Sequence, residues 1–332
     1  MSDSFQALVL RQSDDKKTLA NIETLTDADL PEGEVLVAVE YSTINYKDAL
    51  AVTGKGKIVR SWPLVPGIDF AGTVLESNDS RYATGDKVVL TGWSVGEKYW
   101  GGYSQRQRVK GDWLVHLPDG LDTRQAMAVG TAGFTAMLCV LALEEAGIKP
   151  GDKPVLVTGA TGGVGSVAVA LLAQLGYPVA ALTGKAEAHD YLKELGASEI
   201  VGGPEWQSDP RPLEAQRWAG AVDTVGSKPL ARVLAEMDYG GAVAACGLAA
   251  GADLPTTVMP FILRGVRLLG VESVNCPLAR RQVAWQRLAQ DLPAAKLERM
   301  SQQSVGLAGV ADWCGKLLNR QVQGRVLVDV NG

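Results

Sequence analysis

The sequence predicts an α/β protein in which a doubly wound parallel sheet interrupts a strand-rich domain. Short stretches alternate apolar and polar positions over roughly the first 120 residues. Buried-strand patterns then alternate with helical ones, and the pattern becomes mixed again after about residue 270. The 332 residues are enough for two domains. We therefore expect the strand-rich domain at 1–125, the parallel-sheet domain at 126–270, and a return to the first domain at 271–332.

Strands dominate the first part of the chain. The stretches "EVLVAVEYS" (34–42) and "DKVVLTG" (86–92) alternate as half-buried strands do, and turn sequences such as "VPGID" and "ATGDK" interrupt them. The period changes in "DTRQAMAVGTAGFTAMLCVLALEEAG" (122–147), where apolar residues recur every three or four positions until "GIKPGD". This change predicts a long helix where the second domain begins.

The second domain alternates strands with helices. Its predicted strands lie in "PVLVTGA", "PVAALTG", "SEIVGG", "AVDTVG" and "GAVAACG", and helical patterns separate them at 166–176, 187–196 and 229–237. Apolar strands joined by helices form a parallel sheet. Further on, we expect a last sheet strand in "RGVRLLGVESVN" (264–275), a helix at 279–292 and a final strand at 323–330.

Charge and composition exclude several classes of partner. The net charge is −5 and the basic residues form no long runs, which does not fit a nucleic-acid-binding protein. No stretch of 18 apolar residues, about the length that spans a membrane, lacks a charge or a turn signal, and the N-terminal residues do not resemble a signal peptide. We therefore expect a cytoplasmic protein with a small-molecule partner, no membrane contact, and four reduced, mostly buried cysteines.

A glycine-dense turn follows the first predicted strand of the second domain. In "VTGATGGVGSVAV" (157–169), strand, turn and helix succeed one another as in a dinucleotide-binding unit. Gly162 lets the backbone approach a pyrophosphate, and Gly165 lets the helix pack closely on its strand. The free N–H groups at the start of the helix favour phosphate. The alternative is a tight strand-to-helix turn that binds nothing.

The end of the second strand predicts which nicotinamide cofactor is used. An NAD-binding unit has an acidic residue there, which accepts hydrogen bonds from the ribose hydroxyls. This chain instead has Thr183, Gly184 and Lys185, which offer a hydroxyl, an open backbone N–H and a cation. Such groups suit the 2′-phosphate of NADP. Alternatively, Lys185 is an ordinary solvated lysine.

Six stretches of the chain carry a family resemblance: "INYKDALAVTGKGK", "PGIDFAGTV", "GTAGFTAMLCV", "TGATGGVGSVAV", "CGLAAGADLPTTVMPFILRGVRLLGVES" and "NRQVQGRVLV". With the order of parts, they make the whole chain resemble the medium-chain dehydrogenase/reductase superfamily. Within it, the chain is similar to the NADPH-dependent acrylyl-CoA reductase branch, whose members are often labelled quinone oxidoreductases. The resemblance implies a GroES-like catalytic domain, β-rich, in which a Rossmann domain is inserted.

The resemblance also implies the activity. Zinc-dependent members have a cysteine and a histidine where this chain has Asn45 and Ile68, which cannot ligate zinc, and residues 92–112 lack the cysteines of a structural zinc lobe. We therefore expect zinc-independent hydride transfer from NADPH to the β-carbon of acrylyl-CoA, giving propanoyl-CoA. An NADPH:quinone oxidoreductase and a non-catalytic NADP-binding protein are the alternatives.

The segment "INYKDAL" is expected to face the nicotinamide. Tyr46 could donate its hydroxyl to the cofactor ribose or to the substrate carbonyl, and Asn45 could donate an amide hydrogen bond. Tyr46 could instead be a half-buried residue at a strand end. Asp48 is expected to cap or anchor the following helix rather than transfer protons. Related enoyl-thioester reductases use a tyrosine a little further along, where "TGKGKIVR" has none.

The remaining site residues are implied by the resemblance. Leu248 and Ile262 are expected at strand ends, and a symmetric homodimer is expected through the strand in 264–275. The cofactor contacts are Tyr46, Thr161, Gly162, Gly163, Val164, Thr183, Gly184, Lys185, Leu248, Ile262, Ser273 and Asn319, and the basic residues proposed for coenzyme A are Lys55, Lys57, Arg60 and Arg264.

Overall fold

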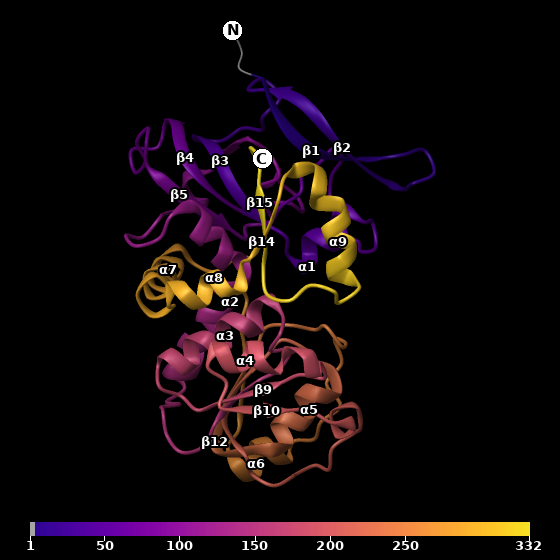
Figure 1. Cartoon of the computed structure of the whole chain (residues 1–332), viewed down its shortest axis with the longest axis vertical. Coiled ribbons are helices and arrows are strands. Elements are labelled where there is room, and N and C mark those ends of the chain that lie inside the picture. Colours follow the sequence, from indigo (N-terminus) through magenta and orange to yellow (C-terminus); the bar gives the residue numbers. More distant parts are fainter. Residues whose placement is uncertain (1–3) are drawn as a thin grey trace. The chain divides into compact units, whose positions relative to one another are not determined.

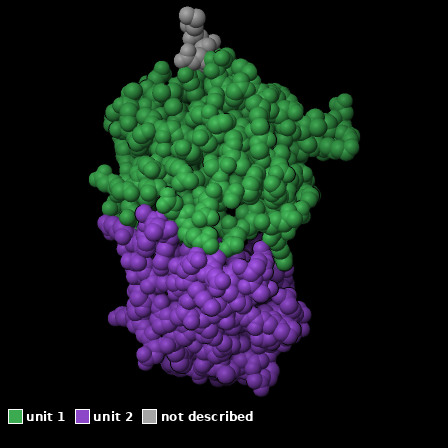
Figure 2. Space-filling view, in the orientation of Figure 1, with its two compact units in different colours: residues 1–131, 273–289, 297–332 green, residues 132–272, 290–296 purple. Residues whose placement is uncertain are grey.

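The computed structural model describes residues 4–332, which form two compact units. Unit 1 takes in the chain up to Thr131 together with 273–289 and 297–332, and unit 2 comprises 132–272 and 290–296 (Figure 2). The domain boundaries expected from the sequence stay predictions.

Unit 1 is built on strands that pair antiparallel except for the parallel pair β14 and β15 (Figure 1). A seven-stranded sheet has the order β14-β15-β3-β4-β5-β7, with β6 paired to β3, and β1 and β2 form a separate hairpin. The strands are β1 (Ser4–Gln12), β2 (Thr18–Thr26), β3 (Val35–Thr43), β4 (Asp69–Ser77), β5 (Lys87–Thr91), β6 (Arg106–Val109), β7 (Leu114–His116), β14 (Gln303–Val305) and β15 (Val326–Asp329).

Helices pack against this sheet and complete the core of unit 1. Phe70, Tyr103 and Leu90 are fully buried in that core, and Val310 and Cys314 of α9 join them. The helices are α1 (Tyr46–Val52), α9 (Val310–Leu318), and most of α7 (Leu278–Asp291) and α8 (Ala294–Met300), whose adjoining ends at 290–296 belong to unit 2, with single 3₁₀ turns η1 (Gly111–Trp113) and η4 (Leu307–Gly309). The sequence patterns predicted β3, β5, β15 and α7, but not the positions of α8 and α9.

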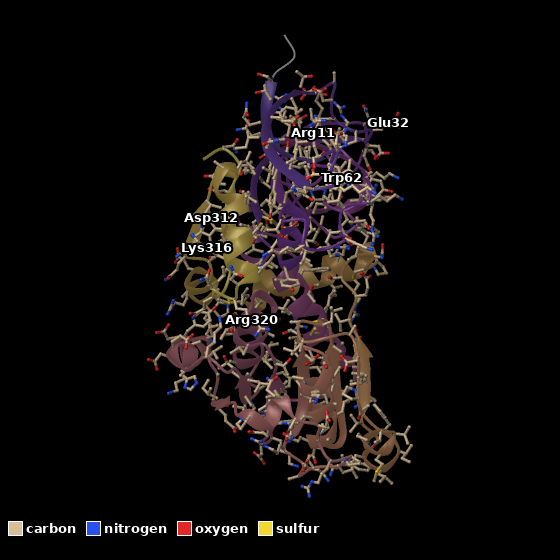
Figure 3. The ribbon with its side chains drawn as sticks, turned by 90° about the vertical axis from the view of Figure 1, so that its right-hand side faces the viewer. Arg11, Glu32, Trp62, Asp312, Lys316 and Arg320 are labelled. Carbon is tan, nitrogen blue, oxygen red and sulfur yellow. The ribbon has the colours of Figure 1, made fainter. Side chains whose placement is uncertain are left out.

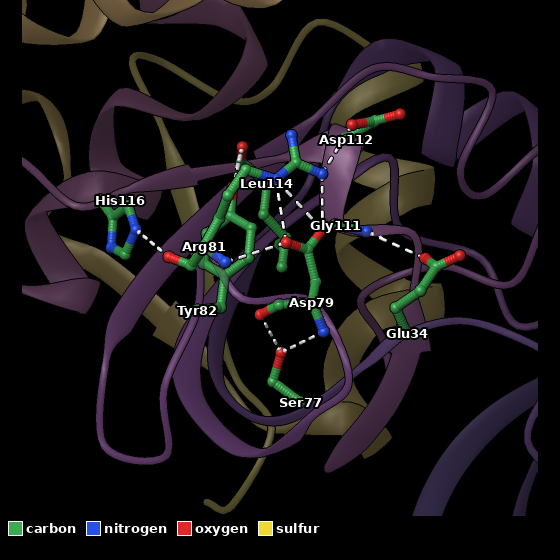
Figure 4. Close-up of polar contacts among 9 residues, drawn as sticks. All are labelled: Glu34, Ser77, Asp79, Arg81, Tyr82, Gly111, Asp112, Leu114 and His116. Carbon is green, nitrogen blue, oxygen red and sulfur yellow. Dashed lines mark hydrogen bonds and ion pairs between the residues drawn. The ribbon is translucent and has the colours of Figure 1, made fainter.

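Ion pairs hold surface segments of unit 1 in place. The Arg81 guanidinium joins two loops, because Nη2 lies 2.5 Å from Asp79 Oδ2 and 2.7 Å from Asp112 Oδ1 (Figure 4). On α9, Asp312 and Lys316 are one turn apart and form an ion pair of 2.7 Å (Figure 3). Exposed ion pairs of this kind contribute little to the free energy of unfolding. The buried sheet and helices therefore account for most of the stability of unit 1.

Unit 2 contains the parallel sheet that the sequence predicts. Its six strands are all parallel and have the order β10-β9-β8-β11-β12-β13. Numbered from β8, this is the order 3-2-1-4-5-6 of a Rossmann fold. The elements are β8 (Val155–Val157), α3 (Gly163–Gln174), β9 (Val179–Leu182), η2 (Ala186–Ala188), α4 (His189–Leu195), β10 (Glu199–Val201), η3 (Pro204–Gln207), β11 (Trp218–Asp223), α5 (Ser227–Glu236), β12 (Met237–Ala245), α6 (Met259–Arg264) and β13 (Arg267–Gly270).

The long helix predicted at 122–147 is α2 (Thr123–Glu145), and it is not continuous. Gly130 interrupts it with φ 53° and ψ −162°. Residues with a side chain rarely adopt this positive φ, and a Cβ there would also lie 2.8 Å from Cγ2 of Thr43, so the position favours glycine. Helix α2 is long and apolar enough to cross a membrane, but 89% of its most apolar window is buried within the protein, as expected of a core helix.

Candidate active site

The glycine-dense turn lies between β8 and α3, as predicted. Gly165 is buried, and a Cβ there would clash with the carbonyl oxygen of Gly159, so the helix can approach its strand only with glycine at this position. Gly162 is exposed, and the nearest atom to a Cβ there would be the Gly159 oxygen at 3.3 Å. The turn is therefore tight where the helix packs and open where a ligand would approach.

The start of α3 supplies donors for an anion. The first N–H groups of a helix have no partner within it and carry positive potential. Here they belong to the segment that begins with Gly163 and Val164, both partly exposed. Ser166, one turn on, donates from Oγ to the Ala160 carbonyl (3.2 Å) and accepts from the Tyr191 hydroxyl (3.0 Å). That pair of bonds, which the sequence did not suggest, ties α4 to the turn.

The second predicted cofactor segment lies beside this turn. Thr183, Gly184 and Lys185 follow β9, which pairs in parallel with β8. The carboxyl ends of neighbouring parallel strands lie at one edge of a sheet, so the structure brings the two segments together. Gly184 is exposed, and a Cβ added there would meet no atom within 4 Å. The Thr183 hydroxyl accepts the Lys185 N–H at 3.1 Å.

Leu248 and Ile262 are both strongly exposed, at 66% and 71%. Leu248 lies in the loop after β12, at a strand end as predicted. The placement of Ile262 at a strand end was wrong, because it lies within the short helix α6. Arg264 ends the same helix, and its guanidinium donates to the carbonyl oxygens of Ala235, Met237 and Glu214 at 2.6–3.1 Å. These bonds favour a structural role for Arg264 over binding of coenzyme A.

In unit 1 the segment "INYKDAL" joins β3 to α1. Asn45 precedes the helix, and Asp48 Oδ2 accepts the Asn45 backbone N–H at 2.9 Å, so Asp48 caps α1 as predicted. Asp48 Oδ1 accepts the N–H of Ile68 at 2.9 Å. Tyr46 is the first residue of α1 and is 56% exposed, so its position is a helix start rather than a half-buried strand end.

Asn45 bridges two buried carboxylates. Its amide nitrogen donates to Asp48 Oδ2 at 3.1 Å and to Asp69 Oδ2 at 2.9 Å, and its Oδ1 accepts from the Arg325 guanidinium at 3.3 Å. Both amide hydrogens are therefore engaged inside unit 1. The bond that Asn45 was expected to donate to a ligand would require one of these to break.

Burial sets the charge state of this network. Asp48 is 1% exposed, and burial, together with the nearby charge of Asp69, raises the pKa of Asp48 to about 7. Burial also raises the pKa of Asp69, although the charge of Arg325 and the Thr131 N–H (2.7 Å from Oδ2) oppose this shift. Two carboxyl groups thus share this buried space with one guanidinium, which can neutralise the charge of one carboxylate. Because a second buried negative charge is unfavourable, one carboxyl group keeps its proton up to near neutral pH.

Other predicted contacts of unit 1 lie on its surface. Lys55, Lys57 and Arg60 are exposed in the segment after α1, where the Arg60 N–H donates to the Glu97 carbonyl at 2.8 Å. Asn319 is exposed at the C-terminal end of α9. Ser273 is partly buried, and its carbonyl accepts from Arg281 Nη2 at 2.9 Å. That these residues and those of unit 2 serve one site stays a prediction.

The residues at the zinc positions fit no metal ion. Asn45 presents its oxygen to a guanidinium, and Ile68 has an alkyl side chain. Among residues 4–332, no group of three or more His, Cys, Asp or Glu side chains is arranged to hold a metal.

Two family models match the chain: "Alcohol dehydrogenase GroES-like domain" over residues 31–119 and "Zinc-binding dehydrogenase" over 163–290. The acrylyl-CoA reductase AcuI of Ruegeria pomeroyi is 60% identical over 329 residues, covering 98% of this chain and 99% of the relative. The YhdH oxidoreductase of Salmonella enterica, solved with NADP, is 59% identical with a TM-score of 0.95 and covers 98% and 99% of the two chains. Bacillus subtilis YhfP, solved with NAD, is 47% identical with a TM-score of 0.96 and covers 99% and 100%.

Proposed function

The chain belongs to the acrylyl-CoA reductase branch of the medium-chain dehydrogenase/reductase superfamily, and from this we propose that it reduces the carbon–carbon double bond of acrylyl-CoA with NADPH. The family and the fold class predicted from the sequence are thus confirmed. The observation that carries the proposal is the identity of 60% over 98% of the chain to an acrylyl-CoA reductase. It is supported by a turn in unit 2 with the shape and donors that a dinucleotide needs.

The residues of unit 2 fit NADPH. The open backbone at Gly162 and the N–H groups that begin α3 would hold the pyrophosphate. Thr183, Gly184 and Lys185 would hold the 2′-phosphate, since no carboxylate stands in that segment to repel it. Relatives have been solved with NADP and with NAD, so the preference for NADPH rests on these three residues.

The reaction needs no metal ion. When bound, the nicotinamide supplies a hydride for the β-carbon of the conjugated thioester. Negative charge then spreads onto the thioester oxygen as an enolate, which a hydrogen-bond donor can stabilise until the α-carbon takes up a proton from solvent. Tyr46 is the proposed donor, because it is exposed at the start of α1 while the Asn45 amide is engaged with Asp48 and Asp69. Asn45 then supports Tyr46 by holding the start of the helix.

Coenzyme A carries phosphates, and the exposed cations after α1 suit them. We assign this role to Lys55, Lys57 and Arg60, which lie within six residues of one another in a segment of unit 1. Arg264 is a weaker assignment, since three carbonyl groups already accept from its guanidinium.

Steady-state kinetics test the proposed function. NADPH oxidation should be fast with acrylyl-CoA and slow with a simple quinone at the same concentration, and the product should be propanoyl-CoA. Faster turnover of the quinone would instead identify a quinone oxidoreductase. NADPH binding without turnover of either compound would identify a protein that only binds the nucleotide.

A homodimer is part of the proposal. β13 is an edge strand of the sheet in unit 2, paired only with β12, and an open edge can pair with another chain. The last sheet strand expected in 264–275 is present, but it is short, because β13 has four residues. Val258 and Leu263, exposed at 65% and 55% nearby in the sequence, add apolar surface. Light scattering that finds only the 35.1 kDa monomer would contradict the dimer. A cytoplasmic location stays a prediction.

A further inference from the structure

Asp223 is a buried carboxylate for which the sequence suggests no role. It ends β11 and is 0% exposed. Its Oδ1 accepts the Thr158 hydroxyl at 2.7 Å, and its Oδ2 accepts the Gly226 N–H at 2.9 Å. Burial raises the pKa of Asp223, and the bonds from Thr158 and Gly226 oppose the shift. Burying a carboxylate costs free energy. The segments that its two hydrogen bonds connect therefore indicate what Asp223 does.

The bonds of Asp223 reach the glycine-dense turn through Thr158. Thr158 follows β8 and is the last residue before that turn. Thr224 contacts it twice: the Thr224 N–H donates to Thr158 Oγ1 at 3.0 Å, and the Thr224 hydroxyl donates to the Thr158 carbonyl at 2.9 Å. Gly159 has φ +59°, and a Cβ there would clash with Thr224 Oγ1. Thr224 therefore restricts the conformation of the first residues of the turn.

Asp223 also reaches the loop that carries Leu248. Its own carbonyl accepts the Cys246 N–H at 2.9 Å, at the end of β12. The loops after β11 and β12 then bond to each other, since the Ala250 N–H donates to the Val225 carbonyl at 2.8 Å. They are closely packed, because a Cβ at Gly226 would lie 2.5 Å from the Gly251 oxygen. One buried residue thus joins three loops at the carboxyl edge of the sheet.

We propose that Asp223 is a positioning residue for the cofactor, which couples the glycine-dense turn to the Leu248 loop. The inference rests on the proposed function to the extent that NADPH is the ligand. Asp223 is fully buried, so it acts through Thr158 and Gly226 rather than by touching the cofactor. Pyrophosphate binding depends on how the turn aims the N–H groups of α3, and small displacements of such donors weaken binding.

Isosteric variants separate this role from general stability. In Asp223→Asn an NH₂ group replaces one acceptor, so either the Thr158 hydroxyl or the Gly226 N–H loses its acceptor while the volume is kept. Thr158→Val removes the bond to Asp223 from the other side, together with the acceptor of the Thr224 N–H, and Thr158→Ser keeps the hydroxyl. If Asp223→Asn does not fold, the two Thr158 variants decide the question.

The experiment measures dissociation constants for NADPH and for adenosine 2′-phosphate, which has the 2′-phosphate but no pyrophosphate. We expect Asp223→Asn and Thr158→Val each to raise the NADPH constant by about tenfold, the worth of one hydrogen bond. The constant for adenosine 2′-phosphate should change by less than about twofold. In the double variant the combined loss should be less than the product of the two single losses, because both substitutions act on the bond between Thr158 and Asp223, although Thr158→Val also removes the acceptor of the Thr224 N–H. Thr158→Ser should behave as the wild type.

Three results would overturn the proposal. They are unchanged NADPH binding in folded variants, equal losses for both nucleotides, and independent losses that multiply in the double variant. The test measures binding of NADPH and not turnover, so its result does not depend on whether acrylyl-CoA is the substrate. A wild-type protein that binds NADPH but leaves acrylyl-CoA unreduced would refute the function and leave the role of Asp223 measurable.

Discussion

Asn45 and Asp69 are joined by a hydrogen bond of 2.9 Å from the amide Nδ2 to the carboxylate Oδ2. Zinc-dependent members of the superfamily have a metal-binding cysteine at the position of Asn45. In this chain the side chain at that position makes a hydrogen bond to Asp69 instead. The same amide nitrogen also reaches Asp48 at 3.1 Å. The start of α1, and with it Tyr46, is therefore held by a network whose charge depends on pH.

Asp48→Asn should flatten the pH dependence of stability. The folded-state pKa of Asp48, about 7, lies above its ordinary value of 3.8. A raised carboxyl pKa contributes stability that is fully present below the unfolded-state pKa and is lost as pH rises through the folded value. The wild type should therefore lose free energy of unfolding relative to Asp48→Asn between pH 4 and 7, at no more than about 1.4 kcal/mol per pH unit.

Denaturant unfolding of both proteins at several pH values checks this, because the contributions of other groups cancel in the difference. Asp48→Asn is expected to be less stable at every pH, since its NH₂ group faces N–H donors of Asn45 and Ile68. The pKa of Asp48 is therefore tested only by how the difference in free energy of unfolding between the two proteins changes with pH. A difference that stays constant from pH 4 to 8 would mean that Asp48 is already ionised at the lower pH.

Tyr46→Phe should lower kcat for acrylyl-CoA by about tenfold to a hundredfold if the hydroxyl stabilises the enolate, as donors to developing oxyanions do. The KM for NADPH should then stay near the wild-type value. A rise in that KM with kcat unchanged would instead place the hydroxyl on the cofactor ribose. Tyr239→Phe is the control, because Tyr239 is exposed in unit 2, on β12. Full activity of Tyr46→Phe would refute both roles.

Removal of metal ions should leave the activity unchanged. Neither Asn45 nor Ile68 can serve as a zinc ligand, and hydrogen-bond donors suffice for an enolate. The measurement is NADPH oxidation with acrylyl-CoA before and after exhaustive dialysis against a chelator, with metal content determined on the same samples. Zinc bound in stoichiometric amount and lost in proportion to the activity would show that the reaction depends on it.

Local sequence patterns predicted the sheet of unit 2 because its central strands β8, β9 and β11 are buried and read as apolar runs. The same patterns could not predict the kink at Gly130, where the backbone lies close to Thr43 and Arg325, residues distant in the sequence. Arg325 is also 280 positions away from Asn45, its hydrogen-bond partner, so only the folded chain reveals that contact. Asp223 was missed for a related reason, since its partner Thr158 follows β8 and precedes it by 65 residues.

The choice between the two nicotinamide cofactors tests the site in unit 2 most directly, and Lys185→Glu is the substitution for it. It removes an ammonium group that can pair with the 2′-phosphate and adds a carboxylate that can accept from a ribose hydroxyl. The turn at 162–165 is left intact. Losing one charge-assisted bond costs about 1.5–3 kcal/mol, so the KM for NADPH should rise by about tenfold to a hundredfold. Use of NADH should fall little or improve.

Lys193→Glu provides the matched control, because it makes the same change of charge at an exposed position on α4. Both variants should be assayed with NADPH and NADH against the same enoyl-CoA. Thr183 and the backbone at Gly184 can hold part of the phosphate, which would keep the effect of Lys185→Glu near tenfold. Equal losses with both cofactors would indicate general damage to unit 2. If Lys185→Glu matched Lys193→Glu, Lys185 would be a solvated lysine, and the preference for NADPH would have to come from other residues.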